Sequence, residues 1–190
     1  MTSKAGGVIC LWDLGAGPSP AAAIEVVRSQ VERLFGLDVV IWAGHERPTH
    51  VFDARRGQAS STAILEWLLE HEPAPARKTL AISDMDLFIP ILTFVFGEAQ
   101  LGGRAAVVST ARLVPSNVLP GDHRLFTTRL LKEAAHELGH TFGLVHCSVR
   151  ECVMSRSASL LGVDAKSARF CSDCWTRYLD QRDHPGGTDE

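Results

Sequence analysis

Residues 136–146 read HELGHTFGLVH, the most specific chemical signal in this 190-residue chain. Its first residues form the end of a segment with helical periodicity that runs from Asp122 to about Phe142. His136 and His140 are four residues apart, so on a helix both imidazoles project in the same direction and can bind one ion. The pattern therefore predicts a helix that presents two metal ligands near its C-terminal end.

The residues around these two histidines complete the features of a catalytic metal site. Glu137 is offset from them by about 100° around the helix, close enough to reach a metal-bound water without being a ligand. Gly143 lets the backbone turn sharply, and His146 can then return as a third ligand. Three neutral histidines and one open position are typical of catalytic zinc. Taken singly, these residues would read as an ordinary polar helix surface, but their joint spacing argues against that interpretation.

The same helix has an apolar side and a polar side at about 100° per residue. The apolar side consists of Leu130, Leu131, Ala134, Ala135, Leu138 and Phe142. The polar side consists of Arg129, Lys132, Glu133, His136 and His140. The metal ligands are therefore expected on the side of the helix that faces away from the apolar core.

Four of the five cysteines follow the histidines directly, as Cys147, Cys152, Cys171 and Cys174. Two thiolate pairs joined by a loop suit a closed, tetrahedral structural zinc. Four reduced core thiols are one alternative. A redox Cys-x-x-Cys at the last pair is another, although no thioredoxin-like strand precedes it. Cys10, alone in a predicted strand, is interpreted as an inert core thiol.

Met154 lies two residues after Cys152. In a turn that follows the third histidine, its soft side chain would lie beneath the metal site. A methionine in an ordinary loop is the alternative, and position alone does not separate the two.

Composition narrows the class of protein. The chain has a mass of 20.6 kDa, a net charge of −3, 45% hydrophobic and 22% charged residues, which suits one globular domain. The charge excludes a strongly basic nucleic-acid binder and gives no reason to expect a membrane partner. The apolar run Val8–Trp12 is too short for a signal-peptide core, and Leu87–Phe96 is too short to span a bilayer. We therefore expect a cytoplasmic protein, in which clustered cysteines favour metal over disulfides. A monomer is the default expectation, because no sustained heptad or large apolar surface stripe appears.

The rest of the chain alternates between strand and helix patterns. Strands are predicted at 8–14, 39–42, 79–83 and 105–109, with a short edge strand at 94–97; helices are predicted at about 20–35 and 61–71. Residues 44–60 are predicted to form a loop, and residues 183–190 a frayed tail. This alternation predicts an α/β fold with a mixed, mostly parallel sheet.

The motifs HExxHxxGxxH, Cys-x4-Cys-x-Met and Cys-x-x-Cys together resemble the archaemetzincin family, a branch of the metzincin clan of zinc metalloproteases. They cover residues 136–174. A weaker similarity extends upstream through Arg56-Gly57-Gln58, Ser60-Ser61-Thr62 and Phe94-Val95-Phe96-Gly97, so the resemblance spans most of the chain.

The resemblance implies a role for each motif residue. The three histidines (His136, His140, His146) would hold a catalytic zinc, and the four cysteines (Cys147, Cys152, Cys171, Cys174) a structural zinc. Glu137 would be the general base and Met154 the Met-turn residue. The single domain would divide into an upper subdomain of about 1–143, with a twisted sheet, and a lower one of about 144–182. An antiparallel edge strand, here 94–97, would pair with extended peptide.

These features predict a zinc-dependent peptidase with two zinc ions per chain, in which Glu137 activates a zinc-bound water. The natural substrate is unknown. The alternative is a zinc-stabilised peptide-binding module with weak turnover, although such a module has no need of a base at Glu137. A DNA-binding function conflicts with the excess of acidic over basic residues in the chain. Some metzincins carry a tyrosine just after the methionine; here Ser155 and Arg156 follow it, and Tyr178 is assigned no role.

Overall fold

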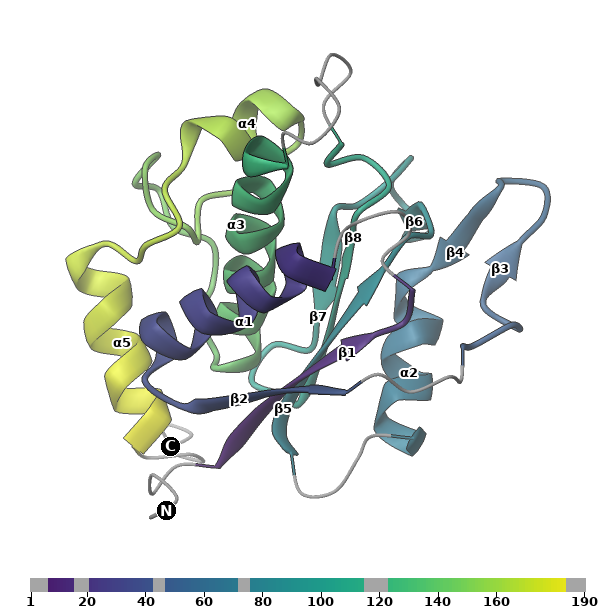
Figure 1. Ribbon diagram of the computed structural model, residues 1–190. Helices are drawn as coiled ribbons and strands as arrows, with labels where there is room; N and C mark the ends of the chain where they lie inside the picture. Colours follow the sequence, from purple (N-terminus) through teal and green to yellow (C-terminus); the bar gives the residue numbers. More distant parts are fainter. Residues whose placement is uncertain (1–6, 16–20, 43–46, 72–75, 115–122, 184–190) are drawn as a thin grey trace.

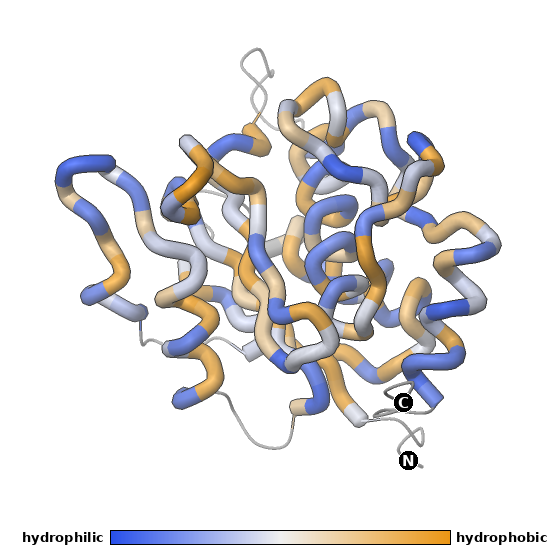
Figure 2. Tube along the Cα trace, turned by 180° about the vertical axis from the view of Figure 1, so that it is seen from behind, coloured by the Kyte–Doolittle hydropathy of each residue, from blue (hydrophilic) through white to orange (hydrophobic). Residues whose placement is uncertain are grey.

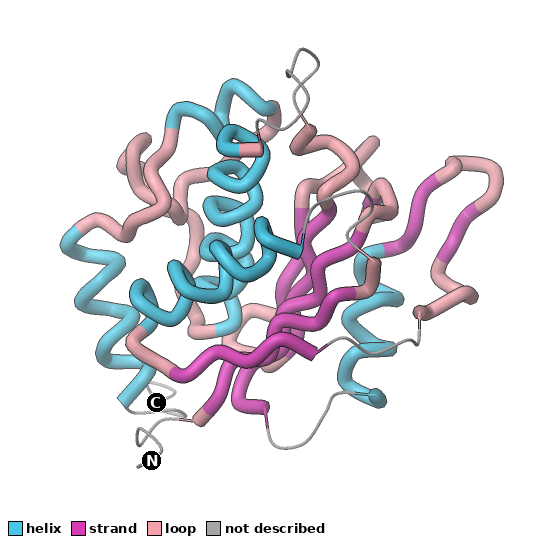
Figure 3. Tube along the Cα trace, in the orientation of Figure 1, coloured by secondary structure: helices cyan, strands magenta, loops and turns pink. Residues whose placement is uncertain are grey.

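A central sheet with helices on both faces forms the body of the protein (Figures 1 and 3). The computed structural model describes residues 7–15, 21–42, 47–71, 76–114 and 123–183. In chain order the elements are β1 (Val8–Asp13), α1 (Ala21–Phe35), β2 (Asp38–Trp42), β3 (Phe52–Asp53), β4 (Gln58–Ser60), α2 (Ser61–His71), β5 (Ala76–Ser83), β6 (Leu87–Phe88), β7 (Gly97–Ala99), β8 (Ala105–Ser109), α3 (Arg124–Thr141), α4 (Leu160–Ala165) and α5 (Ser172–Asp183).

The main sheet has the strand order β2-β1-β5-β8-β7, and every pair is parallel except β7 with β8. The prediction of a mixed, mostly parallel sheet is therefore confirmed. Helices α1, α3 and α5 lie on one face of the sheet and α2 on the other (Figure 1). The small sheet β3-β4-β6 lies at the side of α2.

The central strands are buried on both faces because each face is covered by helices. In β8, Ala106 and Val108 join the core under α1 and α3, whereas Ala105 and Val107 join the core under α2. Hydrophobic and hydrophilic residues alternate along the helices, as expected for elements with one buried side (Figure 2). No described helix is long and apolar enough to cross a membrane.

Several expected boundaries differ from the structure. The edge strand is not 94–97 but β7, because the residue-by-residue pairing with β8 begins with Gly97 opposite Val108. Val95 makes only an isolated bridge to Leu87. The supposed loop 44–60 contains the β3–β4 hairpin, and α4 and α5 were not expected at all. Asp122 and residues 184–190 lie outside the described residues, so neither the expected helix start nor most of the expected tail is tested.

The polar side of α3 is buried as well as its apolar side, because the C-terminal segment packs against it. Arg129 forms an ion pair of 2.7 Å with Asp164, and Lys132 donates hydrogen bonds of 3.0 Å to the carbonyl groups of Val163 and Asp164. The residue after Lys132, Glu133, forms a buried ion pair of 2.8 Å with Lys166. The C-terminal segment is thereby held beneath the helix that carries the histidines. The division near Gly143 into two subdomains stays a prediction.

Candidate metal centres and catalytic cleft

The end of α3 and the turn after it bring three imidazoles together. His136, His140 and His146, here called the histidine cluster, each offer a ring nitrogen, and these nitrogens lie within 4.8 Å of one another. The Nε2 atoms of His136 and His140 are 3.2 Å apart. Two nitrogens on one tetrahedral zinc, with bonds of about 2.0–2.1 Å, are separated by about 3.3 Å. Gly143, with φ of +82°, makes the turn that returns His146, so the cluster fits one zinc ion.

The other ring nitrogens keep two of these histidines in the form that binds metal. His136 Nδ1 lies 2.8 Å from the carbonyl oxygen of Val153, and His140 Nδ1 lies 2.7 Å from that of Leu144. A carbonyl oxygen only accepts, so Nδ1 carries the proton and the Nε2 lone pair is free for a metal. Burial is the main cause that lowers the pKa of all three histidines, which favours their neutral form.

Glu137 is buried and lines the same cleft as the histidine cluster, without belonging to the set of converging ring nitrogens. Burial, and next the charge of Glu133, raise the pKa of Glu137 well above its ordinary value. A carboxylate with a raised pKa is a stronger proton acceptor than an exposed one, which suits a general base.

Gly97 explains how Glu137 fits beneath the edge strand. A Cβ added at Gly97 would lie 2.7 Å from Cγ and Oε1 of Glu137 and 2.6 Å from the carbonyl oxygen of Val107. A Cβ carbon does not tolerate contacts this short. The carbonyl oxygen of Val107 belongs to the backbone of β8, so it cannot easily move aside. Only glycine therefore lets β7 lie this close to Glu137 while it stays paired with β8.

We expect Gly97→Ala to reduce kcat/KM of the peptide cleavage predicted from the sequence by about 100-fold, because small displacements of reacting groups have effects of that order. The overpacking should destabilise the fold by only about 1–3 kcal/mol. Steady-state kinetics and thermal unfolding measure the two effects. The matched control is Ala99→Gly, which weakens the same strand without crowding Glu137 and should cause a much smaller loss. Equal losses in the two variants would contradict the close-packing explanation.

Met154 packs against α3 at Gly139, which lies between His136 and His140 in the sequence. It is fully buried, and a Cβ at Gly139 of α3 would overlap its sulfur atom. The preceding residue, Val153, accepts the hydrogen bond from His136. The same short turn therefore packs against α3 and orients the ring of His136.

The four cysteines form a second compact group, here called the cysteine cluster. Their sulfur atoms lie within 4.8 Å of one another, and all four are free thiols. The sulfur atoms of Cys147 and Cys171 are 3.8 Å apart, far beyond a disulfide bond and close to the separation of about 3.8 Å expected for two thiolates on one tetrahedral zinc. Backbone N–H groups of Val149 and Cys171 donate to Cys147 and Cys152 at 3.4 and 3.3 Å. The donor set therefore fits a closed zinc site.

The charge states of the cysteines point to the same need for a cation. Burial raises the pKa of Cys152 and of Cys174, whereas the backbone N–H of Cys174 lowers the pKa of Cys171. Buried thiols of this kind become thiolates readily only beside a positive charge. Cys10 is buried in β1 and Tyr178 is buried with its hydroxyl donating to Phe35, so neither belongs to the site.

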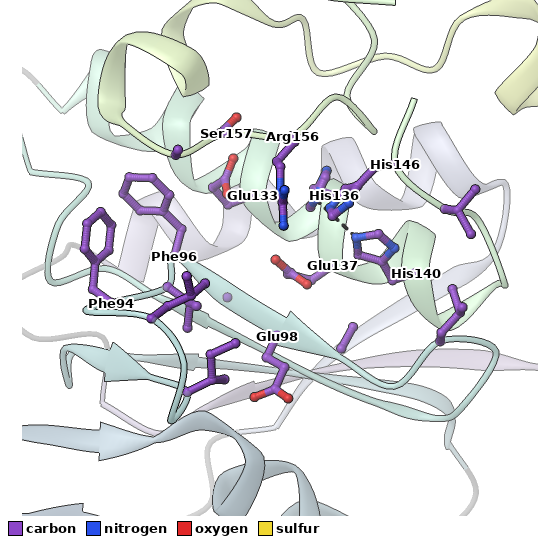
Figure 4. A pocket seen from close by; sticks show the side chains of 18 of the residues that line it. Phe94, Phe96, Glu98, Glu133, His136, Glu137, His140, His146, Arg156 and Ser157 are labelled. Carbon is purple, nitrogen blue, oxygen red and sulfur yellow. Dashed lines mark hydrogen bonds between the residues drawn. The ribbon is translucent and has the colours of Figure 1, made fainter. Parts of the chain in front are cut away.

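A cleft of about 710 Å³ opens between the edge strand and the histidine cluster (Figure 4). Its walls are β7 and segment 89–96 on one side, and α3 and residues 156–158 on the other. Phe94 and Phe96, in edge-to-face contact with ring centroids 5.3 Å apart, line the apolar end.

The upstream stretch 56–58, noted in the sequence, supports the rim of this cleft. Arg56 and Gln58 donate hydrogen bonds of 2.9 Å to the carbonyl groups of Leu92 and Thr93, which fixes the rim. Arg112 lies 4.0 Å above the ring of Phe94. These contacts give the stretch 56–58 a role in positioning the rim.

On the edge strand itself, the hydroxyl groups of Ser61 and Thr62 donate to the carboxylate of Glu98. Sequence reasoning attached no role to these contacts, because their partners are about 36 residues apart and carry no local pattern.

Three converging imidazoles beside a buried carboxylate, in a cleft beneath an edge strand, define a zinc metallopeptidase. The model of peptidase family M54 matches residues 31–180, and the chain belongs to that family of zinc metallopeptidases.

Relatives of the chain carry the same assignment. The archaemetzincin of Methanopyrus kandleri is 46% identical over 140 residues, which cover 74% of this chain and 76% of the relative. The crystal structure of that organism's archaemetzincin matches with a TM-score of 0.86 and 35% identity, over 97% of this chain and 100% of the other. The archaemetzincin structure from Archaeoglobus fulgidus, complexed with malonate, matches with a TM-score of 0.76 and 34% identity, over 90% and 99% of the two chains. The resemblance seen in the motifs is thus confirmed.

Proposed function

We propose that the protein hydrolyses peptide bonds in the cleft, with one zinc held by the histidine cluster, a second held by the cysteine cluster, and Glu137 as general base. The observation that carries this proposal is the convergence of three imidazoles, two of them with Nε2 free, beside a buried carboxylate that is not itself a ligand. The cysteine cluster, by contrast, has four donors and no open position, which suits a structural role.

The edge strand offers a way to bind the substrate. β7 ends the main sheet, pairs with β8 on one side only, and lines the cleft. An extended peptide can therefore add to β7 by backbone hydrogen bonds, while the apolar end at Phe94 and Phe96 accepts a side chain. This mode would bring a peptide carbonyl over Glu137, because Gly97 places the strand so close to that residue.

Zinc in the histidine cluster would supply Lewis-acid chemistry, which acidifies water and polarises a carbonyl group. Glu137 accepts the proton of the attacking water and delivers it to the leaving amine. Val153 and Leu144 keep the histidine rings oriented through the hydrogen bonds to Nδ1. The cysteine cluster ties the turn that contains Val153 and Met154 to the start of α5, so it braces the floor of the catalytic site.

We also propose that the protein acts in the cytoplasm and does not bind nucleic acid. The net charge of −3 and the five cysteines without disulfides support these two points.

Metal analysis combined with cleavage profiling tests the proposed function. We expect about two zinc ions per chain and cleavage products from a broad peptide library at neutral pH, detected by mass spectrometry. A fully zinc-loaded protein that binds library peptides but cleaves none would contradict the proposal and support a peptide-binding module instead.

A further inference from the structure

Arg156 is a charged residue of the cleft that the proposed chemistry does not use. It follows Met154 by two residues, and its side chain points into the cleft on the side of the histidine cluster (Figure 4). The side chain is exposed and makes no hydrogen bond or ion pair with any residue that the structure describes. An arginine aimed into a cleft without a partner there is available to a ligand.

The other charged side chains that line the cleft are three carboxylates, two of which have partners. Glu98 accepts hydrogen bonds from Ser61 and Thr62, and Glu133 is paired with Lys166. Glu137 is the third carboxylate. Within the described lining, Arg156 is therefore the only lysine or arginine, and it gives one wall of the cleft a positive charge.

The electrostatics of this wall favour an anion. Arg156 lines the same cleft as the histidine cluster, and its side chain lies on the same wall (Figure 4). Zinc in that cluster would add two further positive charges nearby. Like charges at such a site repel each other, and an anion between or beside them offsets that repulsion.

Guanidinium chemistry specifies which anion fits. The planar fork of arginine matches a carboxylate with two parallel hydrogen bonds, which a point charge such as lysine does not reproduce. A role on the reacting carbonyl oxygen is less well supported, because groups that stabilise it act where water is excluded, whereas Arg156 is exposed. A carboxylate of the substrate can reach Arg156 from solvent.

We propose that Arg156 binds a carboxylate of the peptide substrate close to the scissile bond and so makes the enzyme selective for acidic peptides. The carboxylate is either the C-terminus of a short peptide or the side chain of Asp or Glu beside the scissile bond. This inference rests on the proposed peptidase function, since it names the substrate class of the same cleft.

The test compares matched peptides on zinc-loaded wild-type protein, Arg156→Gln, Arg156→Lys and the control Arg169→Gln. Arg169 is exposed and lies outside the described lining of the cleft, so its variant removes the same charge elsewhere. One peptide pair differs in a free or amidated C-terminus. Other pairs have both ends blocked and differ in Asp or Asn, or Glu or Gln, at the residues flanking the scissile bond.

For at least one pair, wild type and Arg169→Gln should favour the acidic peptide by about 10- to 100-fold in kcat/KM, as expected for a charge-assisted hydrogen bond. In Arg156→Gln the ratio should fall to about 1, and in Arg156→Lys to an intermediate value. The pair that responds identifies the source of the carboxylate. Ratios near 1 in wild type, or an equal loss on acidic and amide peptides in Arg156→Gln, would overturn the inference.

Binding measured by fluorescence anisotropy separates this inference from the proposed function. If the zinc-loaded protein cleaves nothing but binds the acidic peptide at least 10-fold more tightly than its amide, and Arg156→Gln abolishes that difference, the carboxylate site stands while the peptidase proposal fails. If the protein cleaves peptides but shows no preference for the acidic ones, the peptidase proposal stands and the carboxylate site fails. Zinc content and circular dichroism should be unchanged in Arg156→Gln, because the residue is exposed and outside both clusters.

Discussion

Glu137→Gln is expected to reduce kcat/KM for peptide cleavage by about 1,000-fold, while the protein keeps both zinc ions and its fold. Glutamine has nearly the same shape, so it fits beneath Gly97, but its amide cannot accept a proton from water. Metal binding should persist because the converging donor atoms come from the three histidines, without Glu137. Steady-state kinetics, metal analysis and thermal unfolding measure these three outcomes.

Glu66→Gln is the matched control for this prediction, because Glu66 is an exposed helical glutamate on α2, away from the described cleft lining. Its activity should remain at the wild-type level. The shorter variant Glu137→Ala should also be inactive with both zinc ions bound. Loss of one zinc from Glu137→Gln would instead identify Glu137 as a ligand, and retention of activity would refute its role as the base.

Cys174→Ser should lose one of two zinc ions and lower the free energy of unfolding by more than about 4 kcal/mol, as losses of structural metals do. For a domain of this size, the melting temperature would fall by about 10 °C. Cys174 is buried in the first turn of α5, and the cysteine cluster joins that helix to the turn beneath α3. A serine hydroxyl is a poor substitute for a thiolate at zinc.

Cys10→Ala is the matched control, because Cys10 is equally buried but lies in β1, outside the cysteine cluster. It should keep both zinc ions and lose little stability. On wild type, mild chelation should remove activity before it unfolds the protein, since three neutral ligands with an open position bind zinc less tightly than four thiolates. Simultaneous loss of activity and fold, or two zinc ions in Cys174→Ser, would contradict the assignment of separate roles.

Elements with strong local patterns were predicted closely. The helix at 61–71 and the strand at 105–109 match α2 and β8 residue for residue, since each has a clear apolar pattern between turn signals. The strand expected at 94–97 was wrong because Phe94 and Phe96 are apolar for other reasons: both line the cleft, and Phe96 also joins the main core. Pairing with β8 starts only at Gly97.

The two C-terminal helices were missed because their stability depends on tertiary contacts. α4 has only six residues, and its end is held by Arg129 and Lys132 of α3 rather than by its own sequence pattern. Most residues of α5 are polar, and the helix is anchored by two buried side chains, Cys174 and Tyr178. A helix as short as α4 has little stability of its own.

The sequence by itself determined which donor atoms this protein offers to metal. The spacing of His136 and His140 and the turn at Gly143 act within a few residues, where helix geometry leaves little freedom. Only the tertiary structure decided how those donors are used. The carbonyl of Val153 that orients His136, the edge strand above Glu137 and the burial of the polar side of α3 all come from segments far apart in the chain, which meet because packing brings them together.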